Sequence, residues 1–283
     1  MIRRLPVTAY SLWLATPLGV AMLLFFLAPI GVLGVVSFYG DPGMTQWGSL
    51  DNWAKMFDPF GLLVLVDTLW LGAQVTLLSL VLGYALAWLF VRMPAKLQPV
   101  VIFIVMLPLL TSVVVRTFAW IVILGRQGIV NAALMDLGWI TEPLKLLYTR
   151  SGLVVALANV QLPLMVLPLI NALQKIDLNL SDASESLGAS EWQTFRKVTL
   201  PLSLPGIIAG SLLTFAASIT AFISQSLIGG GQMLFMPMYL YQQASSLSNY
   251  PFAAAISLTF LATVIVCVSA FNLLGRLSRT HTV

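Results

Sequence analysis

Long stretches of this chain carry no charged side chain, and this feature most constrains its fold. The stretches Leu5 to Gly40 and Val198 to Gly275 contain no Asp, Glu, Lys or Arg. Only 8% of the residues are charged, whereas an ordinary soluble domain has about 25%. So few charges cannot cover a water-soluble globule. The composition therefore excludes a soluble enzyme, a nucleic-acid-binding domain and a disordered chain.

The predicted fold is an all-α membrane protein with six transmembrane helices in one domain, residues 1–283. About 20 apolar residues cross the hydrocarbon core, so the last uncharged stretch holds two crossings. Gly229, Gly230 and Gly231 begin the break between them, and the polar segment 245–251 ends it. Pro108 is expected to kink the third crossing. The six predicted spans are 12–38, 68–91, 99–124, 151–173, 204–228 and 252–274.

Lys and Arg counts predict that both termini lie in the cytoplasm, because cytoplasmic loops carry the excess of these residues. In that orientation nine lie inside: Arg3, Arg4, Arg92, Lys96, Lys175, Arg196, Lys197, Arg276 and Arg279. Four lie outside: Lys55, Arg126, Lys145 and Arg150. The remaining one, Arg116, falls within a span. The outer loops also hold acidic residues that could meet an external protein or be simply solvated: Asp41, Asp51, Asp58, Asp136 and Glu142.

Cysteine and histidine, which are frequent in metal sites and catalytic centres, each occur once in the sequence. The single Cys267 permits no intrachain disulfide or thiolate cluster, and the single His281 is three residues from the end. An intramembrane hydrolase would need a nucleophile and a base, so this class is disfavoured. A secondary transporter, the other rival, would be marked by inverted repeats and paired broken helices, and none is predicted. No catalytic residue and no metal site are predicted.

The loop 174–203 is the longest predicted cytoplasmic loop, and its pattern predicts two short helices. Asp177 can cap a helix that runs through Leu187, with Leu180 and Ala183 on its apolar stripe. Gly188 then stands where a left-handed residue would end that helix.

The second helix is expected to begin with a capping box, Ser190 at the cap and Gln193 three residues later. Trp192, Phe195 and Val198 give it an apolar face, and the prolines at 201 and 205 are expected to stop it before the fifth span. Two short helices with exposed apolar faces are typical of a surface that binds a partner protein. It could also lie on the bilayer surface or pack under the bundle.

This loop resembles the cytoplasmic motif of bacterial ABC importer permeases, which reads Glu-Ala-Ala, three residues, Gly, nine residues, Ile, any residue, Leu-Pro. Here the corresponding residues are Asp182-Ala183-Ser184, Gly188, Val198 and Leu200-Pro201. The wider text LGASEWQTFRKVTLPLSLPGIIAG resembles the spermidine/putrescine branch. Matching text elsewhere comprises Leu82-Gly83-Tyr84, Ala87-Trp88, Arg116 with Ala119-Trp120, and 251–255, so the resemblance runs from about Asn52 to the end.

The resemblance implies a type I importer architecture in which this loop is a coupling helix that docks on a separate ATPase. The implied ATPase-coupling residues are Asp182, Ala183, Ser184, Leu187, Gly188, Ala189, Trp192 and Phe195. Three residues depart from the motif: Asp182 replaces Glu, Ser184 replaces Ala, and Val198 replaces Ile. The shorter Asp side chain would weaken a pair with an ATPase Arg or require a closer approach.

The chain contains no G-x-x-x-x-G-K-[ST] loop to cradle ATP phosphates. ATP and Mg are therefore expected on a partner ATPase, and no cofactor on this chain. By resemblance, the assembly has two ATPases, a second permease (a paralogue or a second copy) and an external solute-binding protein, all around a lipid bilayer and without nucleic acid. The implied solute is a small organic molecule, a polyamine first and an amino acid derivative or phosphonate as alternatives.

A polar stripe in the fifth span is the candidate solute path. Ser211, Thr214, Ser218 and Gln225 are spaced on one helix face, and their alternative role is to hold helix to helix. Arg116 is the one charge deep in an apolar span, which makes it a functional candidate, although it could also snorkel to the outer surface. A cation near the path would repel a polyamine. Asp67 is a possible partner for Arg116.

Overall fold

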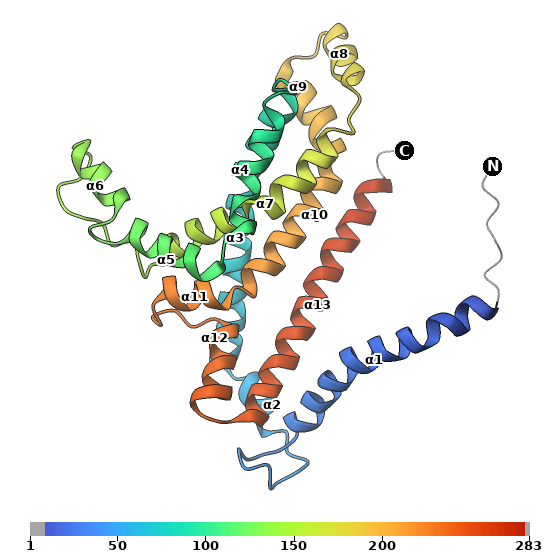
Figure 1. The fold of residues 1–283 in the computed structure, drawn as a ribbon, viewed down its shortest axis with the longest axis vertical. Helices are drawn as coiled ribbons and strands as arrows, with labels where there is room; N and C mark the ends of the chain where they lie inside the picture. Colours follow the sequence, from blue (N-terminus) through green and yellow to red (C-terminus); the bar gives the residue numbers. More distant parts are fainter. Residues whose placement is uncertain (1–8, 281–283) are drawn as a thin grey trace. The chain divides into compact units, whose positions relative to one another are not determined.

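The structure, a computed structural model, describes residues 9–280, without the side chains of 9–15, 178, 181, 182, 185 and 274–280. Within this range it is helical and contains no β-strand, which confirms the predicted all-α class (Figure 1). Six helices are long and apolar enough to cross a membrane, in agreement with the predicted number. The elements are α1 Ala9–Ser37, α2 Asp51–Met56, α3 Pro59–Arg92, α4 Gln98–Leu110, α5 Val113–Leu124, α6 Ile129–Asp136, α7 Arg150–Leu173, α8 Leu178–Ser186, α9 Glu191–Thr194, η1 Phe195–Thr199, α10 Leu200–Ile219, α11 Phe222–Gly229, α12 Met236–Tyr241, η2 Gln242–Ser246 and α13 Tyr250–Thr280.

The chain forms two compact units. The smaller unit contains residues up to 62 together with 240–262. In it, the Asn52 side-chain amide donates to the Tyr39 carbonyl oxygen over 2.7 Å and so fixes α2 to the end of α1. The carboxylate of Asp41 accepts backbone N–H groups of Gln46 and Thr45, and these bonds, that of Gln46 foremost, lower the pKa of Asp41.

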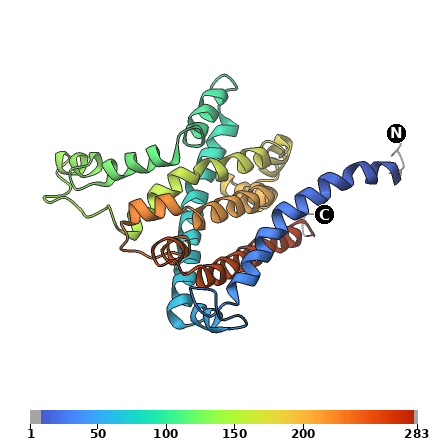
Figure 2. The ribbon, with the colours of Figure 1, turned by 60° about the horizontal axis from the view of Figure 1, so that its bottom comes forward.

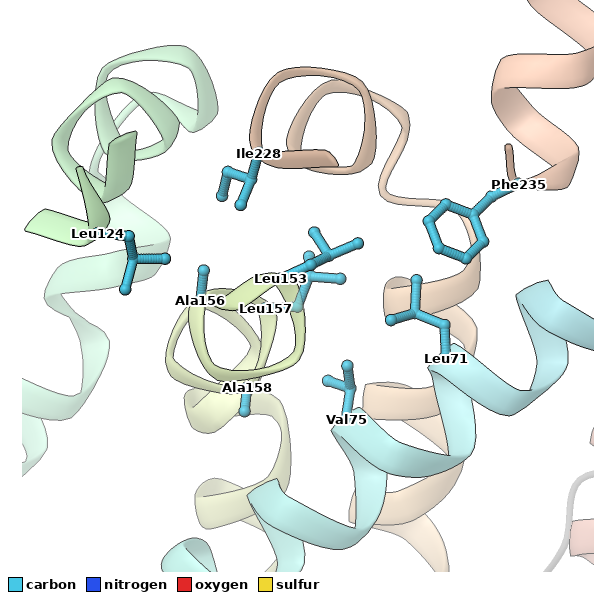
Figure 3. Packing of buried hydrophobic residues seen from close by; sticks show 9 residues of the cluster. All are labelled: Leu71, Val75, Leu124, Leu153, Ala156, Leu157, Ala158, Ile228 and Phe235. Carbon is cyan, nitrogen blue, oxygen red and sulfur yellow. The ribbon is translucent and has the colours of Figure 1, made fainter. Parts of the chain in front are cut away.

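The larger unit, residues 63–239 and those from 263 on, is built around α7. Figure 3 shows α7 in the middle, with Leu153 and Leu157 directed toward Leu71 of α3 and Ile228 of α11. A second apolar cluster continues along α7 through Met165 and Leu169 and meets the far end of α3 and α4. Because α7 touches neighbours along its whole length, 67% of its most apolar 18-residue segment is buried, the largest share among the six candidate spans.

Two glycines let α10 approach α7 closely, and Figure 2 shows these helices side by side. A Cβ atom at Gly206 would lie 2.5 Å from Ala172 Cβ and 2.8 Å from the Pro168 carbonyl oxygen. A Cβ at Gly210 would lie 2.9 Å from the Met165 carbonyl oxygen. Gly206 and Gly210 are four residues apart, the small-xxx-small spacing with which membrane helices bring their backbones together.

The third predicted span, 99–124, is not one helix. It is divided into α4 and α5 at residues 111–112, where Thr111 is extended with φ −97° and ψ 148°. Pro108 has no N–H and cannot continue the hydrogen-bond ladder. Its own carbonyl oxygen, freed by the break, accepts from the Thr111 hydroxyl over 3.2 Å and from the Arg116 guanidinium. In place of the expected kink at Pro108, the helix is broken at residues 111–112.

The fifth predicted span, 204–228, is also divided, at residues 220–221 between α10 and α11. The Gln225 side-chain amide donates to the carbonyl oxygens of Ser218 (2.8 Å) and Ile219 (3.3 Å), which lie at the end of α10. This amide replaces the backbone donors that the break removes. The segment 236–246, predicted as part of a connecting break, forms the short helices α12 and η2.

The expectation that prolines stop the second loop helix is wrong. A continuous helical path runs from α9 through η1 into α10, and Pro205 lies inside α10. Pro201 is in the first turn of α10, where a proline removes little from the ladder. The turn before it, η1, is a wider π-helical segment. The loop is therefore joined directly to the membrane helix that follows.

The close approach of α10 to α7 predicts that Gly206→Leu and Gly210→Leu each destabilise the protein. Overpacking of this kind costs about 1–3 kcal/mol and should lower the thermal unfolding midpoint by several degrees in detergent, measured by intrinsic fluorescence. Ala209→Leu is the matched control, because Ala209 is on the exposed side of α10 and should leave the midpoint unchanged. Equal midpoints for all three variants would contradict the packing described above.

Candidate functional site

The loop between α7 and α10 folds as two short helices around a glycine, as predicted, and we call residues 178–199 the hinged loop. Helix α8 begins after Asp177, whose carboxylate accepts the Asn179 N–H over 3.0 Å. It ends before Gly188, which has φ +82°. This left-handed conformation costs an L-residue about 1–2 kcal/mol but costs glycine little.

The second helix of the hinged loop begins with the predicted capping box. The Ser190 hydroxyl accepts the Gln193 N–H over 3.3 Å, and the Gln193 side-chain oxygen accepts the Ser190 N–H over 3.0 Å. These two bonds satisfy N–H groups that have no partner inside the helix. The direction of α9 is thereby set by its own first turn.

The predicted coupling residues fall into an exposed group and a packed group. Leu187 has 89% of its surface exposed and Trp192 has 67%, and Ala183 and Gly188 are exposed as well. Ala189 is half-buried. The Ser184 hydroxyl lies 3.0 Å from that of Thr194 and ties α8 to α9. Asp182 falls within α8, and its side chain lies outside the described part, so its role stays a prediction.

Phe195 attaches the hinged loop to α3. Its ring packs edge-to-face against Trp88, with centroids 5.3 Å apart, and against Tyr84 at 5.7 Å. Trp192 stacks on the same ring at 5.3 Å. Aromatic pairs of this geometry contribute about 0.5–1.5 kcal/mol each beyond their buried area. We call Tyr84, Trp88 and Phe195 the aromatic anchor.

Two polar contacts reinforce the aromatic anchor. The Tyr84 hydroxyl lies 3.0 Å from the Ser203 hydroxyl of α10, and the Arg92 guanidinium lies 4.0 Å from the centre of the Trp88 ring. Thr194 is buried beside the anchor. Tyr84 and Trp88 belong to the matching text and Arg92 to the basic residues expected in the cytoplasm, but no packing role was predicted for these three residues. The signal was their spacing of four residues along one face of α3.

The polar stripe proposed as a solute path is buried in this structure. Ser211, Thr214, Ser218 and Gln225 all lie within the protein, and Ser218 and Gln225 bond to backbone carbonyl oxygens of α10. Their burial favours the alternative role in helix packing. Thr214 Oγ1 and Gln225 Oε1 are buried without a hydrogen-bond partner in the described part of the chain. The solute-path assignment therefore stays a prediction.

The two divided spans meet each other in the larger unit, and the expectation of no paired broken helices is wrong. Helix α11 packs on α5, and the Thr117 and Ser224 hydroxyls lie 3.1 Å apart at a buried contact. Both breaks fall at segments whose freed carbonyls are met by a side chain, Arg116 in one and Gln225 in the other. The sequence pattern did not reveal this because long side chains replace the backbone donors.

Arg116 has a local structural partner, the Pro108 carbonyl oxygen at the end of α4. A cation at a helix C-terminus also interacts favourably with the helix dipole. The predicted pairing of Arg116 with Asp67 is wrong. Asp67 pairs with Arg150 over 3.0 Å, and the Arg150 Nε group donates to Gln74 over 2.8 Å. Arg150 therefore fixes the start of α7 to α3. Its position in the sequence, directly before the predicted span 151–173, did not indicate this role.

The backbone conformation at Gly188 predicts different results for two substitutions. Gly188→Val should destabilise the end of α8 by about 1–2 kcal/mol, and faster amide hydrogen exchange in residues 178–187 should report it. Gly188→Asn should stay close to the parent, because Asn tolerates the left-handed region. Apart from the two adjacent residues, no atom that the structure describes lies within 4 Å of a Cβ at this position, so backbone strain separates the two. Equal exchange in both variants would contradict a required left-handed residue.

Known structures share this fold. A crystal structure of a bacterial ABC transporter involved in the import of the acidic polysaccharide alginate matches 94% of this chain and 95% of its own, with a TM-score of 0.77 and 19% identity. An amino acid ABC transporter with histidines matches 81% of this chain and 96% of its own, with a TM-score of 0.52 and 15% identity. These likenesses concern the fold alone.

Sequence relatives give the family. The spermidine/putrescine transport system permease protein PotB of Escherichia coli (strain K12) is 33% identical over 87% of this chain and 90% of its own length. The molybdenum transport system permease protein ModB of the same strain is 32% identical over 72% of this chain and 88% of its own. Residues 79–281 match the family "Binding-protein-dependent transport system inner membrane component". This chain belongs to that family: it is a multi-pass inner-membrane permease subunit of an ABC importer, and ATP hydrolysis resides in a separate subunit.

Proposed function

We propose that this chain forms half of the pathway through which a polyamine enters the cytoplasm, driven by an ATPase that binds the hinged loop. The observation that carries the proposal is the combination of an exposed apolar surface at Leu180 and Leu187 with the attachment of the same loop to α3 through Phe195. A segment that is exposed on one side and firmly packed on the other can transmit a movement of its partner to the membrane helices.

The ATPase partner is expected at the exposed side of α8 and α9. Leu180 and Leu187 both expose apolar side chains there, and a group of exposed apolar residues is typical of a surface that another protein covers. ATP and Mg would lie on that ATPase. We propose an assembly of two permeases, two ATPases and one external solute-binding protein. This chain pairs with a paralogue or a second copy to close the pathway.

Both termini are proposed to lie in the cytoplasm. Arg92 is at the end of α3 that also contacts Phe195 and the hinged loop through Trp88. The basic residues near the end of α3 and those of η1, Arg196 and Lys197, therefore lie at one end of the larger unit. The positive-inside rule places that end in the cytoplasm, where an ATPase partner would be found.

A polyamine is favoured as solute because PotB proteins are spermidine/putrescine permeases by name and match most of this chain. The contact of Arg116 with the Pro108 carbonyl oxygen weakens one objection, since that cation has a structural task. The unpartnered oxygens of Thr214 and Gln225 could accept hydrogen bonds from an amine when the helices separate. The alternatives are an amino acid derivative or a phosphonate.

The solute assignment is tested with the cognate external binding protein and the transporter in liposomes. Spermidine or putrescine should raise the melting temperature of the binding protein and should be taken up in the presence of ATP. A shift with amino acids or phosphonates and none with polyamines would overturn the polyamine assignment. Uptake without ATP and an ATPase would overturn the proposed mechanism as a whole.

The aromatic anchor predicts that Phe195→Ala uncouples the transporter. Loss of three aromatic contacts of about 0.5–1.5 kcal/mol each should weaken the attachment of the hinged loop to α3 by roughly tenfold or more. Solute uptake per ATP hydrolysed, measured in liposomes, should therefore fall. Phe118→Ala is the matched control, because Phe118 is an exposed aromatic residue of α5. Unchanged coupling in a stably assembled Phe195→Ala transporter would exclude the anchor from force transmission.

A further inference from the structure

A cavity of about 570 Å³ lies between α3 and the segment formed by α9 and η1. Val81, Ala85 and Trp88 form its wall on α3, and Trp192 and Phe195 form the opposite wall. These side chains are apolar over most of their surface. The cavity is open on one side, so in a membrane its walls need a covering molecule.

The length and position of the cavity match one leaflet of a bilayer. Val81 and Arg92, both on its wall, are eleven residues apart in α3, which corresponds to about 16 Å of helix. This is close to half of the hydrocarbon core of about 30 Å. Because α3 is a candidate membrane span that ends at Arg92, we expect the apolar wall to run from the membrane surface into the hydrocarbon region.

The lining of the cavity carries one charge of each sign, Arg92 and Glu191, and both residues are exposed. Neither forms an ion pair with another side chain that the structure describes. The guanidinium carbon of Arg92 lies 4.0 Å from the centre of the Trp88 ring, and a guanidinium in such a contact can still donate N–H groups to a phosphate. Glu191 can accept hydrogen bonds from an ammonium group.

We propose that this cavity binds a phospholipid whose headgroup has a phosphate and a primary amine, as in phosphatidylethanolamine. The acyl chain lies along Val81 and Ala85, the phosphate contacts Arg92, and the ammonium contacts Glu191. A purely anionic headgroup would leave the Glu191 carboxylate opposed by negative charge. A choline headgroup would offer it no N–H donor. The bound lipid packs beside Phe195 and stabilises the aromatic anchor.

The test uses the purified transporter exchanged into an equimolar mixture of phosphatidylethanolamine, phosphatidylcholine and phosphatidylglycerol, with native mass spectrometry to count retained lipids. Phosphatidylethanolamine should be retained preferentially. Arg92→Gln should lower its retention about fivefold, the change that about 1 kcal/mol per basic residue gives. Lys96→Gln is the matched control: Lys96 is basic and exposed at the same end of α3 but does not line the cavity.

Two further variants separate the apolar and polar contributions. Ala85→Trp should fill the cavity and remove the retained lipid, and Glu191→Gln should keep a lipid but lose the preference for ethanolamine over choline. Equal retention of the three lipids by the parent, or undiminished retention in Ala85→Trp, would overturn the proposal. So would cross-linking of Ala85→Cys to an ATPase side chain in the assembled transporter, because a protein group would then fill the cavity.

Discussion

The packing of Phe195 between α9 and α3 is the contact on which the working of the hinged loop depends. Its ring meets Tyr84 and Trp88 edge-on and stacks with Trp192. Through this contact, the loop that carries the exposed Leu187 side chain is packed on a membrane helix. With it, a pull on α9 reaches α3 directly and α10 through the continuous helical path of η1.

The larger unit combines one helix that is packed along its whole length with two spans that are divided. α7 is held along its length by α3 and by the two glycines of α10. The spans beside it are divided at 111–112 and 220–221, and side chains of Arg116 and Gln225 replace the missing backbone bonds. Side-chain hydrogen bonds can be exchanged for water or solute at lower cost than helical ladders. The two divided spans therefore depend on side-chain hydrogen bonds, whereas α7 is held by packing along its length.

Sequence reasoning predicted the features that depend on local chemistry. The capping box at Ser190, the left-handed residue at Gly188 and the six apolar helices all follow from composition, spacing and propensity. It failed where distant side chains decide. The partner of Asp67 is Arg150, in another helix. The break after Ile219 contains neither Pro nor Gly that would mark it in the sequence. The side-chain amide of Gln225, in the next helix, supplies the donor for the carbonyl oxygen at the end of α10. The aromatic anchor joins residues more than a hundred positions apart, which no single-sequence pattern reveals.

The central claim is that a separate ATPase covers the exposed side of the hinged loop while Phe195 keeps its inner side on α3. The most direct measurement is a structure of the assembled transporter in its nucleotide-free and nucleotide-bound states. The account predicts that Leu187, 89% exposed in this chain alone, is buried against the ATPase in both states, and that Phe195 stays packed on Trp88 as the loop moves. A Leu187 side chain that remains exposed, or a Phe195 ring that leaves Trp88 during the cycle, would contradict it.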